Sequence, residues 1–259
     1  MAKTYIPDNI RIASQEVKAA KLYDLMIPGP GVPWEDRNSS GSVSSFLKTA
    51  TGLMFHPAAT LNRMRRPDSR AEANSFAMVC AVIWVMAVFI QSAFDYFVYY
   101  KSNVNLIANQ YWVNTAIQAV LVGAGAFMLP RVASGLYFKL AGYDMTTKVS
   151  PELVHNTLAY LMAPSLVALI PGSYMGTYIG IWIAPLLALL WILLLWMAAG
   201  VGRLRIGVAG AMVSSVLTFL ICMGIGVAIY FVGRTVGSKT LDMDSIPTPL
   251  HPEQVAPPQ

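Results

Sequence analysis

Charged residues are scarce in this chain: only 12% of its 259 residues are Asp, Glu, Lys or Arg, whereas 56% are hydrophobic. A soluble domain carries about 25% charged residues, because its surface faces water. The shortage therefore argues against an ordinary soluble domain and indicates that much of the surface faces lipid. The net charge of +5 suggests either a nucleic-acid-binding protein or a membrane protein with cytoplasmic cations.

Cysteine and the usual catalytic patterns are also lacking. The two cysteines, Cys80 and Cys222, lie in apolar runs, where cysteine is a small packing residue. Two cysteines define neither a disulfide framework nor a metal site. The chain has no Ser–His–acid set, no Gly-rich phosphate loop with a lysine and no cluster of carboxylates. We therefore expect no enzyme activity, no metal and no cofactor.

The first 45 residues predict a cytoplasmic N-terminal arm. Charged residues interrupt any apolar run near the start, so no signal peptide is expected. Residues 7–26 have the pattern of an amphipathic helix, and the Pro- and Gly-rich residues 27–33 predict an extended linker. Residues 38–45 are small and polar, and we expect them to be flexible.

Residues 46–70 predict a second amphipathic, interfacial segment, broken near His56–Pro57. Its basic residues cluster toward the end: Arg63, Arg65, Arg66 and Arg70. Two placements are open at this point. The segment lies on the bilayer surface with its cations at the headgroups, or it is a cytoplasmic helix pair packed on the membrane bundle.

Five apolar stretches follow, each near the length of roughly 20 residues that crosses a hydrocarbon core. They are residues 76–99, 112–137, 154–170, 178–199 and 208–232, and the third is short and interrupted by Pro164. Backbone polar groups in lipid must be paired internally, so each stretch is expected to be a helix. The sequence thus predicts an all-α integral membrane protein, with a five-helix bundle over residues 71–236 and an extended Pro-rich tail over 237–259.

The charges between these stretches predict the orientation. Basic residues lie before the first stretch, between the second and third, and between the fourth and fifth: Arg63, Arg65, Arg66, Arg70, Lys139, Lys148, Arg203 and Arg205. The positive-inside rule then places the N-terminus in the cytoplasm, and an odd number of passes places the C-terminus outside. Cations spread over these loops, rather than gathered with stacking aromatics, argue against nucleic-acid binding.

Four polar residues in the apolar stretches are candidates for function. Gln91 and Asp95 are four residues apart on one helix face. An ionisable group in a membrane helix suggests a proton or ion role, and interfacial solvation is the alternative. Arg131 is expected to reach the cytoplasmic headgroups, with pairing to Asp144 or Glu152 as the alternative. His155 could ligate a metal or a pigment, although a role at the helix cap and interface fits its position better.

From residue 46 to about 233, the order of features resembles the Yip1-domain family of five-helix membrane proteins. The stretch 53–64, LMFHPAATLNRM, is similar to the family's opening, where a proline precedes a short basic-apolar helix. Residues 140–143, LAGY, followed by 158–160, LAY, and 163–164, AP, are similar to its middle. The eukaryotic acidic–aromatic–Gly–Pro signature is matched only in part by residues 22–30. The resemblance is therefore to prokaryotic members, and it implies a scaffold-like fold in the cytoplasmic membrane.

These observations lead to the hypothesis of a non-catalytic membrane scaffold or accessory subunit of a larger membrane assembly. Its expected partners are membrane lipids and other membrane protein subunits. Two alternatives stay open. One is a small-solute or ion transporter or channel that uses Asp95 and Gln91, with helix breaks at Pro164, Pro171 and Pro185. The other is a cofactor- or pigment-binding subunit that uses His155.

Overall fold

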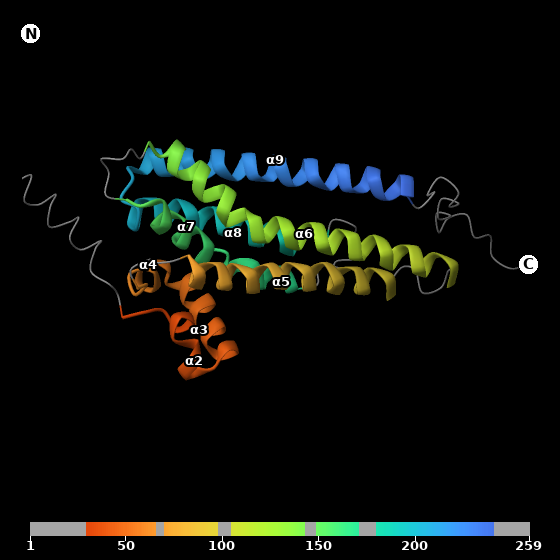
Figure 1. The fold of residues 1–259 in the computed structure, drawn as a ribbon, viewed down its shortest axis with the longest axis horizontal. Helices are drawn as coiled ribbons and strands as arrows, with labels where there is room; N and C mark the ends of the chain where they lie inside the picture. The colour runs from red at the N-terminus through yellow and green to blue at the C-terminus, as the bar shows by residue number, and fades with distance from the viewer. Residues whose placement is uncertain (1–29, 66–69, 98–104, 143–148, 171–179, 241–259) are drawn as a thin grey trace, which may run out of the picture.

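The structure of the chain is a computed structural model that describes residues 30–65, 70–97, 105–142, 149–170 and 180–240. The helix expected at 7–26, Arg66 and the tail beyond 240 lie outside the described residues. Within the described part, the chain forms helices and no strands, as predicted (Figure 1). In chain order the elements are η1 (Pro33–Asp36), α2 (Arg37–Ser40), α3 (Ser42–Phe55), α4 (Pro57–Leu61), α5 (Ala71–Asp95), α6 (Asn105–Leu140), α7 (Pro151–Tyr160), η3 (Ala163–Leu169), α8 (Gly180–Gly202) and α9 (Val208–Thr240), where η marks a 3-10 helix.

Four helices in the described part are long and apolar enough to cross a membrane. Their spans are Ala71–Phe94 in α5, Tyr111–Leu140 in α6, Ile183–Gly202 in α8 and Val208–Ala228 in α9. Each has at least the roughly 20 residues that a hydrocarbon core requires. The fold is therefore all-helical and fits an integral membrane protein. α6 begins before the predicted residue 112, and α9 extends beyond the predicted residue 232.

The third predicted stretch, 154–170, is not one continuous helix. It forms the last part of α7, a short turn and then η3. Pro164 has no N–H to donate to the carbonyl group of Tyr160, so the α-helix ends there and continues only as a 3-10 helix. The sequence predicted a short helix interrupted by Pro164, and the structure shows that interruption, with the α-helix ending at Tyr160 and a 3-10 helix following it.

The broken segment nevertheless runs alongside α5 over most of its length. Just before α5, Arg70 Nη2 donates to Glu152 Oε1 at 3.0 Å. Near the other end, Gln91 Nε2 donates to the Ile170 carbonyl oxygen at 2.8 Å. Arg70 and Gln91 are about 30 Å apart along a helix axis, which is close to the thickness of a hydrocarbon core. A continuous α-helix from 152 to 170 would be slightly shorter than this distance. The 3-10 helix rises roughly 2.0 Å per residue, more than an α-helix does, and this extra rise makes up the difference.

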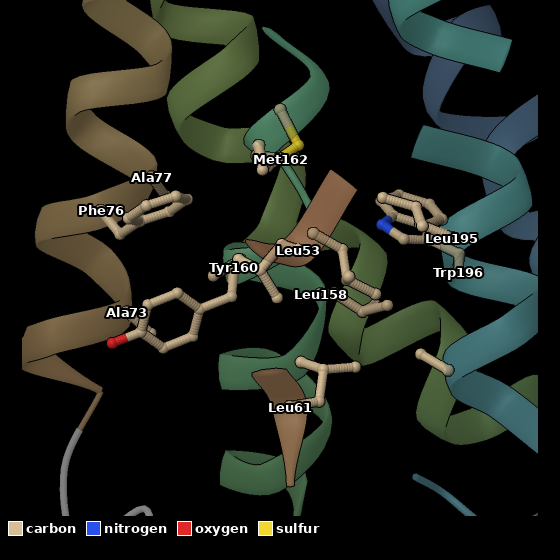
Figure 2. Packing of buried hydrophobic residues seen from close by; sticks show 14 of the residues in the cluster. Leu53, Leu61, Ala73, Phe76, Ala77, Leu158, Tyr160, Met162, Leu195 and Trp196 are labelled. Carbon is tan, nitrogen blue, oxygen red and sulfur yellow. The ribbon is translucent and has the colours of Figure 1, made fainter. Parts of the chain in front are cut away.

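Residues 30–65, called the cap from here on, pack against one end of the bundle, which we call the cap-side end (Figure 1). α5, α7 and α9 begin at this end, and α6 and α8 finish there. The buried apolar residues of the cap belong to the same core as those of α5, α7 and α8: Val32, Trp34, Phe46, Ala50, Leu53, Leu61 and Met64. Figure 2 shows Leu53 and Leu61 in one cluster with Phe76, Tyr160 and Trp196.

The cap corrects one expectation and confirms another. Residues 38–45, expected to be flexible, lie mostly in α2 and the start of α3, so the predicted domain boundary at residue 45 falls inside a helix. The predicted break near His56–Pro57 is confirmed, since α3 ends at Phe55 and α4 begins at Pro57. Of the two placements considered, the cap helices are packed on the bundle.

Candidate functional site

Trp34 fastens the cap to the start of α5. Its indole Nε1 donates to the Glu72 carbonyl oxygen at 3.2 Å and to Ser75 Oγ at 3.0 Å. Its ring meets those of Phe46 and Phe76 edge to face, with centroids 5.9 and 5.8 Å apart. The residue is only 5% exposed. A buried tryptophan with its N–H satisfied combines a large apolar contact with a directional bond, so it fixes the position of η1 on the bundle.

Charged residues at the junction of η1 and α2 pair around this anchor. Glu35 Oε2 accepts a hydrogen bond from the backbone N–H of Arg65 at 3.1 Å. Asp36 forms an ion pair with the Arg65 side chain, and Arg37 forms one with Glu72. These side chains remain partly exposed to solvent, so each pair contributes about 0–1 kcal/mol. Their main effect is to orient the cap.

The arginines of the basic cluster that the sequence predicted at the end of the cap have different surroundings in the structure. Arg65 and Arg70 are engaged with carboxylates, of Asp36 and Glu152 respectively. Arg63 is exposed, and its carbonyl oxygen accepts a 2.7 Å hydrogen bond from the Gly31 N–H. Arg66 lies outside the described residues. The cluster is therefore partly a set of structural ion pairs and only partly a free cationic surface.

Glu152 is the partner of Arg70 rather than of Arg131. Its carboxylate accepts a hydrogen bond from its own backbone N–H and another from Arg70, and these lower the pKa of Glu152 below its ordinary value. The guanidinium of Arg131 is exposed and stacks over the ring of Phe127, 4.6 Å from its centroid. The alternative pairing with Asp144 involves a residue outside the described part. Contact of Arg131 with the headgroups stays a prediction.

His155 is buried in α7 and does not cap it. The N-cap is Ser150, whose Oγ accepts from the Leu153 N–H at 3.1 Å. The His155 side chain is held on both sides: Nε2 lies 2.9 Å from Asn74 Oδ1, and Nδ1 lies 3.3 Å from Ser134 Oγ. A metal or pigment would have to displace one of these partners. No group of three metal-binding side chains is found among the described residues.

Gln91 also has a structural partner. Its amide bonds to the carbonyl group of Ile170, which follows η3 and precedes a proline that cannot extend a helix. Gln91 is 6% exposed. Asp95 ends α5, but its side chain lies outside the described part of the structure. The structure therefore ties Gln91 to the broken segment and does not place it with Asp95 in a site.

Two hollows flank the corner between α3 and α4. One is an open groove of about 410 Å³ on the cap, lined by Lys48, Thr51, Gly52, Phe55 and His56. The other is a smaller pocket of about 80 Å³ between α4 and the end of α8, lined by Pro57, Ala58, Leu61, Asn62, Ala198, Ala199, Gly202 and Arg203. Neither hollow contains the polar residues that the sequence singled out in the apolar stretches. The second, with an arginine at its edge, is the more enclosed.

The sequence analysis missed Trp34 and the charged residues after it. They follow a Pro- and Gly-rich stretch and occupy a single turn, which is too short for any hydrophobic periodicity. A signal was nevertheless present. A lone tryptophan beside acidic residues, close before an amphipathic helix, is costly to leave in water and indicates docking onto a folded surface.

No family model matches this chain, and neither a curated protein nor a solved structure matches it. The resemblance to the Yip1-domain family therefore stays a prediction based on the motifs given above.

Proposed function

We propose that this chain is a non-catalytic membrane scaffold or accessory subunit that holds partner proteins or lipids within a larger membrane assembly. One contrast between its helices carries the proposal. In the apolar window of α5, 44% of the residues are buried within the chain, against 17% in α6 and 28% in α9. The outer faces of α6 and α9 therefore offer extended contact area to lipid or to another subunit.

We further propose that the cap lies in the cytoplasm of a prokaryotic cell and that the chain crosses the membrane five times. Cations gather at the cap-side end in the described residues: Arg63, Arg65, Arg70, Lys139, Arg203 and Arg205. The positive-inside rule assigns such an end to the cytoplasm. α6 and α8 both run toward the cap, so the α7–η3 segment, which follows α5 for about 30 Å, is the fifth pass between them.

The cap supports the lipid-binding part of the proposal. Although one side of α3 is buried, its other side exposes Val43, Leu47 and Phe55, at 74%, 46% and 63% of their surface. Lys48 is exposed beside them. An apolar row flanked by a cation suits a helix whose outer side rests at the boundary between headgroups and acyl chains.

Orientation is tested with single cysteines in a chain whose own Cys80 and Cys222 are replaced. Lys48→Cys in the cap should react with an impermeant maleimide only in inverted vesicles. Ser238→Cys near the end of α9 should react only from the outer side. Labelling of both positions from the same side would contradict the five-pass arrangement.

The scaffold role is tested by gentle affinity purification of the full-length chain from native membranes, read by mass spectrometry. We expect companion membrane proteins at near-stoichiometric amounts. A membrane protein of similar size and hydropathy, purified in parallel, serves as the control for adventitious carry-over. A monodisperse chain without companions would contradict the proposal.

A further inference from the structure

The pocket between α4 and the end of α8 is small but large enough for a ligand group. Its volume is about 80 Å³, whereas one water molecule needs on the order of 10–15 Å³ measured in this way. Small side chains on both helices leave it open, and a Cβ added at Gly202 would meet no atom within 4 Å. The pocket therefore has room for several waters or for one phosphate-sized group.

Arg203 lines this pocket with a guanidinium whose hydrogen-bond donors are only partly satisfied. Its Nη1 donates to Asn62 Oδ1 at 3.4 Å, near the long limit for a hydrogen bond. Its Nε is buried and has no hydrogen-bond partner within the described residues. A buried donor on a charged group is costly to leave without a partner, and an anion in the pocket would remove that cost.

The charge around the pocket favours an anion. None of the residues that line it carries a carboxylate. Partial burial of the guanidinium, and the positive charge of Arg205 close by, lower the pKa of Arg203 from its ordinary value. An arginine remains charged in spite of such a shift. The local field therefore attracts a negatively charged group.

The position of the pocket along α8 indicates which anion is present at that depth of the membrane. The apolar span of this helix ends at Gly202, and Arg203 follows directly. The pocket therefore lies where the hydrocarbon core gives way to the headgroups on the cap side. The phosphates of phospholipids occupy that depth, and basic pockets beside membrane helices bind anionic headgroups.

We propose that this pocket binds a phosphate group, supplied by an anionic phospholipid of the cap-side leaflet. The guanidinium of Arg203 donates two parallel hydrogen bonds to the phosphate oxygens, as planar arginine forks do. The apolar side chains of Pro57, Ala58 and Ala198 contact the apolar part of the lipid next to its headgroup. This inference deepens the lipid-binding part of the proposed function and rests on it.

The test uses the full-length chain, exchanged into detergent and offered phosphatidylglycerol or phosphatidylcholine, with bound lipid counted by native mass spectrometry. The variants are Arg203→Gln, which removes the charge, and Gly202→Leu, which fills the pocket from a position with open space. Lys139→Gln is the matched control, because it removes an exposed cation of the cap-side end that does not line the pocket. We expect selective retention of phosphatidylglycerol, about tenfold weaker in both pocket variants and unchanged in the control.

A second arm separates the two sources of a phosphate group. Inorganic phosphate is titrated into lipid-free protein, and we expect no binding at millimolar concentration and no displacement of phosphatidylglycerol. Displacement of the lipid by phosphate would show that the lipid source is wrong. Equal retention of the two lipids, or full retention of phosphatidylglycerol by Arg203→Gln and Gly202→Leu, would overturn the site.

The same variants are also purified from native membranes, and the companion proteins that copurify with each are identified by mass spectrometry. Companions without lipid selectivity would contradict the pocket alone. Lipid selectivity without companions would contradict the scaffold role alone.

Discussion

α5 and α9 have the same mean hydropathy in their apolar windows, 2.2 in each, but very different surroundings. α5 is covered by η1, α6, α7 and η3, whereas the contacts of α9 are with α6 and α8. α5 buries a row of small residues spaced four apart, Ala73, Ala77 and Ala81, which lets neighbouring helices approach closely. Hydropathy thus identifies helices that enter lipid, but small and polar residues decide which of them the chain itself covers.

The largest expected effect comes from equal truncations in these two helices. Ile83 of α5 is 7% exposed, and Ile225 of α9 is 45% exposed. Ile83→Ala should lower the free energy of unfolding by about 3 kcal/mol, because it leaves a cavity among fixed neighbours. Ile225→Ala should cost less than about 1 kcal/mol. Detergent-induced unfolding followed by circular dichroism measures both, and equal costs would remove the distinction between covered and open helices.

A matched pair of histidines tests the polar contacts of the covered region. His155→Leu leaves the half-buried Asn74 and the buried Ser134 without this partner and should cost about 2 kcal/mol in unfolding free energy. His56→Leu, at an exposed position in the cap, should cost nearly nothing. An absorbance scan of the wild-type protein checks the alternative role: a visible band lost in His155→Leu would support a pigment ligand rather than a structural contact.

Two glycines test how closely the helices approach. A Cβ at Gly200 would meet the hydroxyl of Tyr137 and would lie 2.8 Å from Ala211 Cβ. Gly200→Ala should therefore cost about 1–2 kcal/mol through overpacking. Gly226→Ala on α9 meets no atom within 4 Å and should be neutral or slightly stabilising. A shift of the thermal midpoint in Gly200→Ala alone is the expected outcome, and equal shifts would contradict the packing at Gly200.

The parts of the fold that follow from local chemistry were predictable from the sequence. Length and apolarity identified the four long helices, and Pro57 marked the break between α3 and α4. Pro164 was recognised as an interruption of the third stretch, but the change to a 3-10 helix was not predicted, because an apolar run with one proline is compatible with a kinked helix as well as with a broken one. In the broken form that the structure shows, the Ile170 carbonyl group after η3 accepts a hydrogen bond from Gln91.

The candidate site was less predictable, because its partners are far apart in sequence. His155 was recognised as unusual, but Asn74 and Ser134, which hold it, come from two other helices. The Arg203 pocket joins the end of α8 to α4, and no local pattern connects them. A single sequence shows which polar residues are costly to bury, but it does not show which other residues form hydrogen bonds or ion pairs with them.

The smallest effect concerns the ion pair between Arg70 and Glu152. The pKa of Glu152 is lowered in the folded state, so the pair stabilises the protein at neutral pH and loses this effect as the pH falls below the ordinary value of about 4.5. The exposure of the pair limits its contribution to about 0–1 kcal/mol. Glu152→Gln should remove this part of the pH dependence of unfolding. An unchanged acid profile would show that the pair does not stabilise the fold.

The proposed scaffold role requires that the open face of α9, or part of it, contacts another subunit. The most direct measurement places a photo-crosslinking residue at Leu220, which is 60% exposed, and for comparison at Leu158, which is fully buried. On irradiation of native membranes, we predict a discrete crosslinked protein from position 220 and only intramolecular products from position 158. Lipid adducts alone at position 220 would contradict a contact between α9 and another subunit.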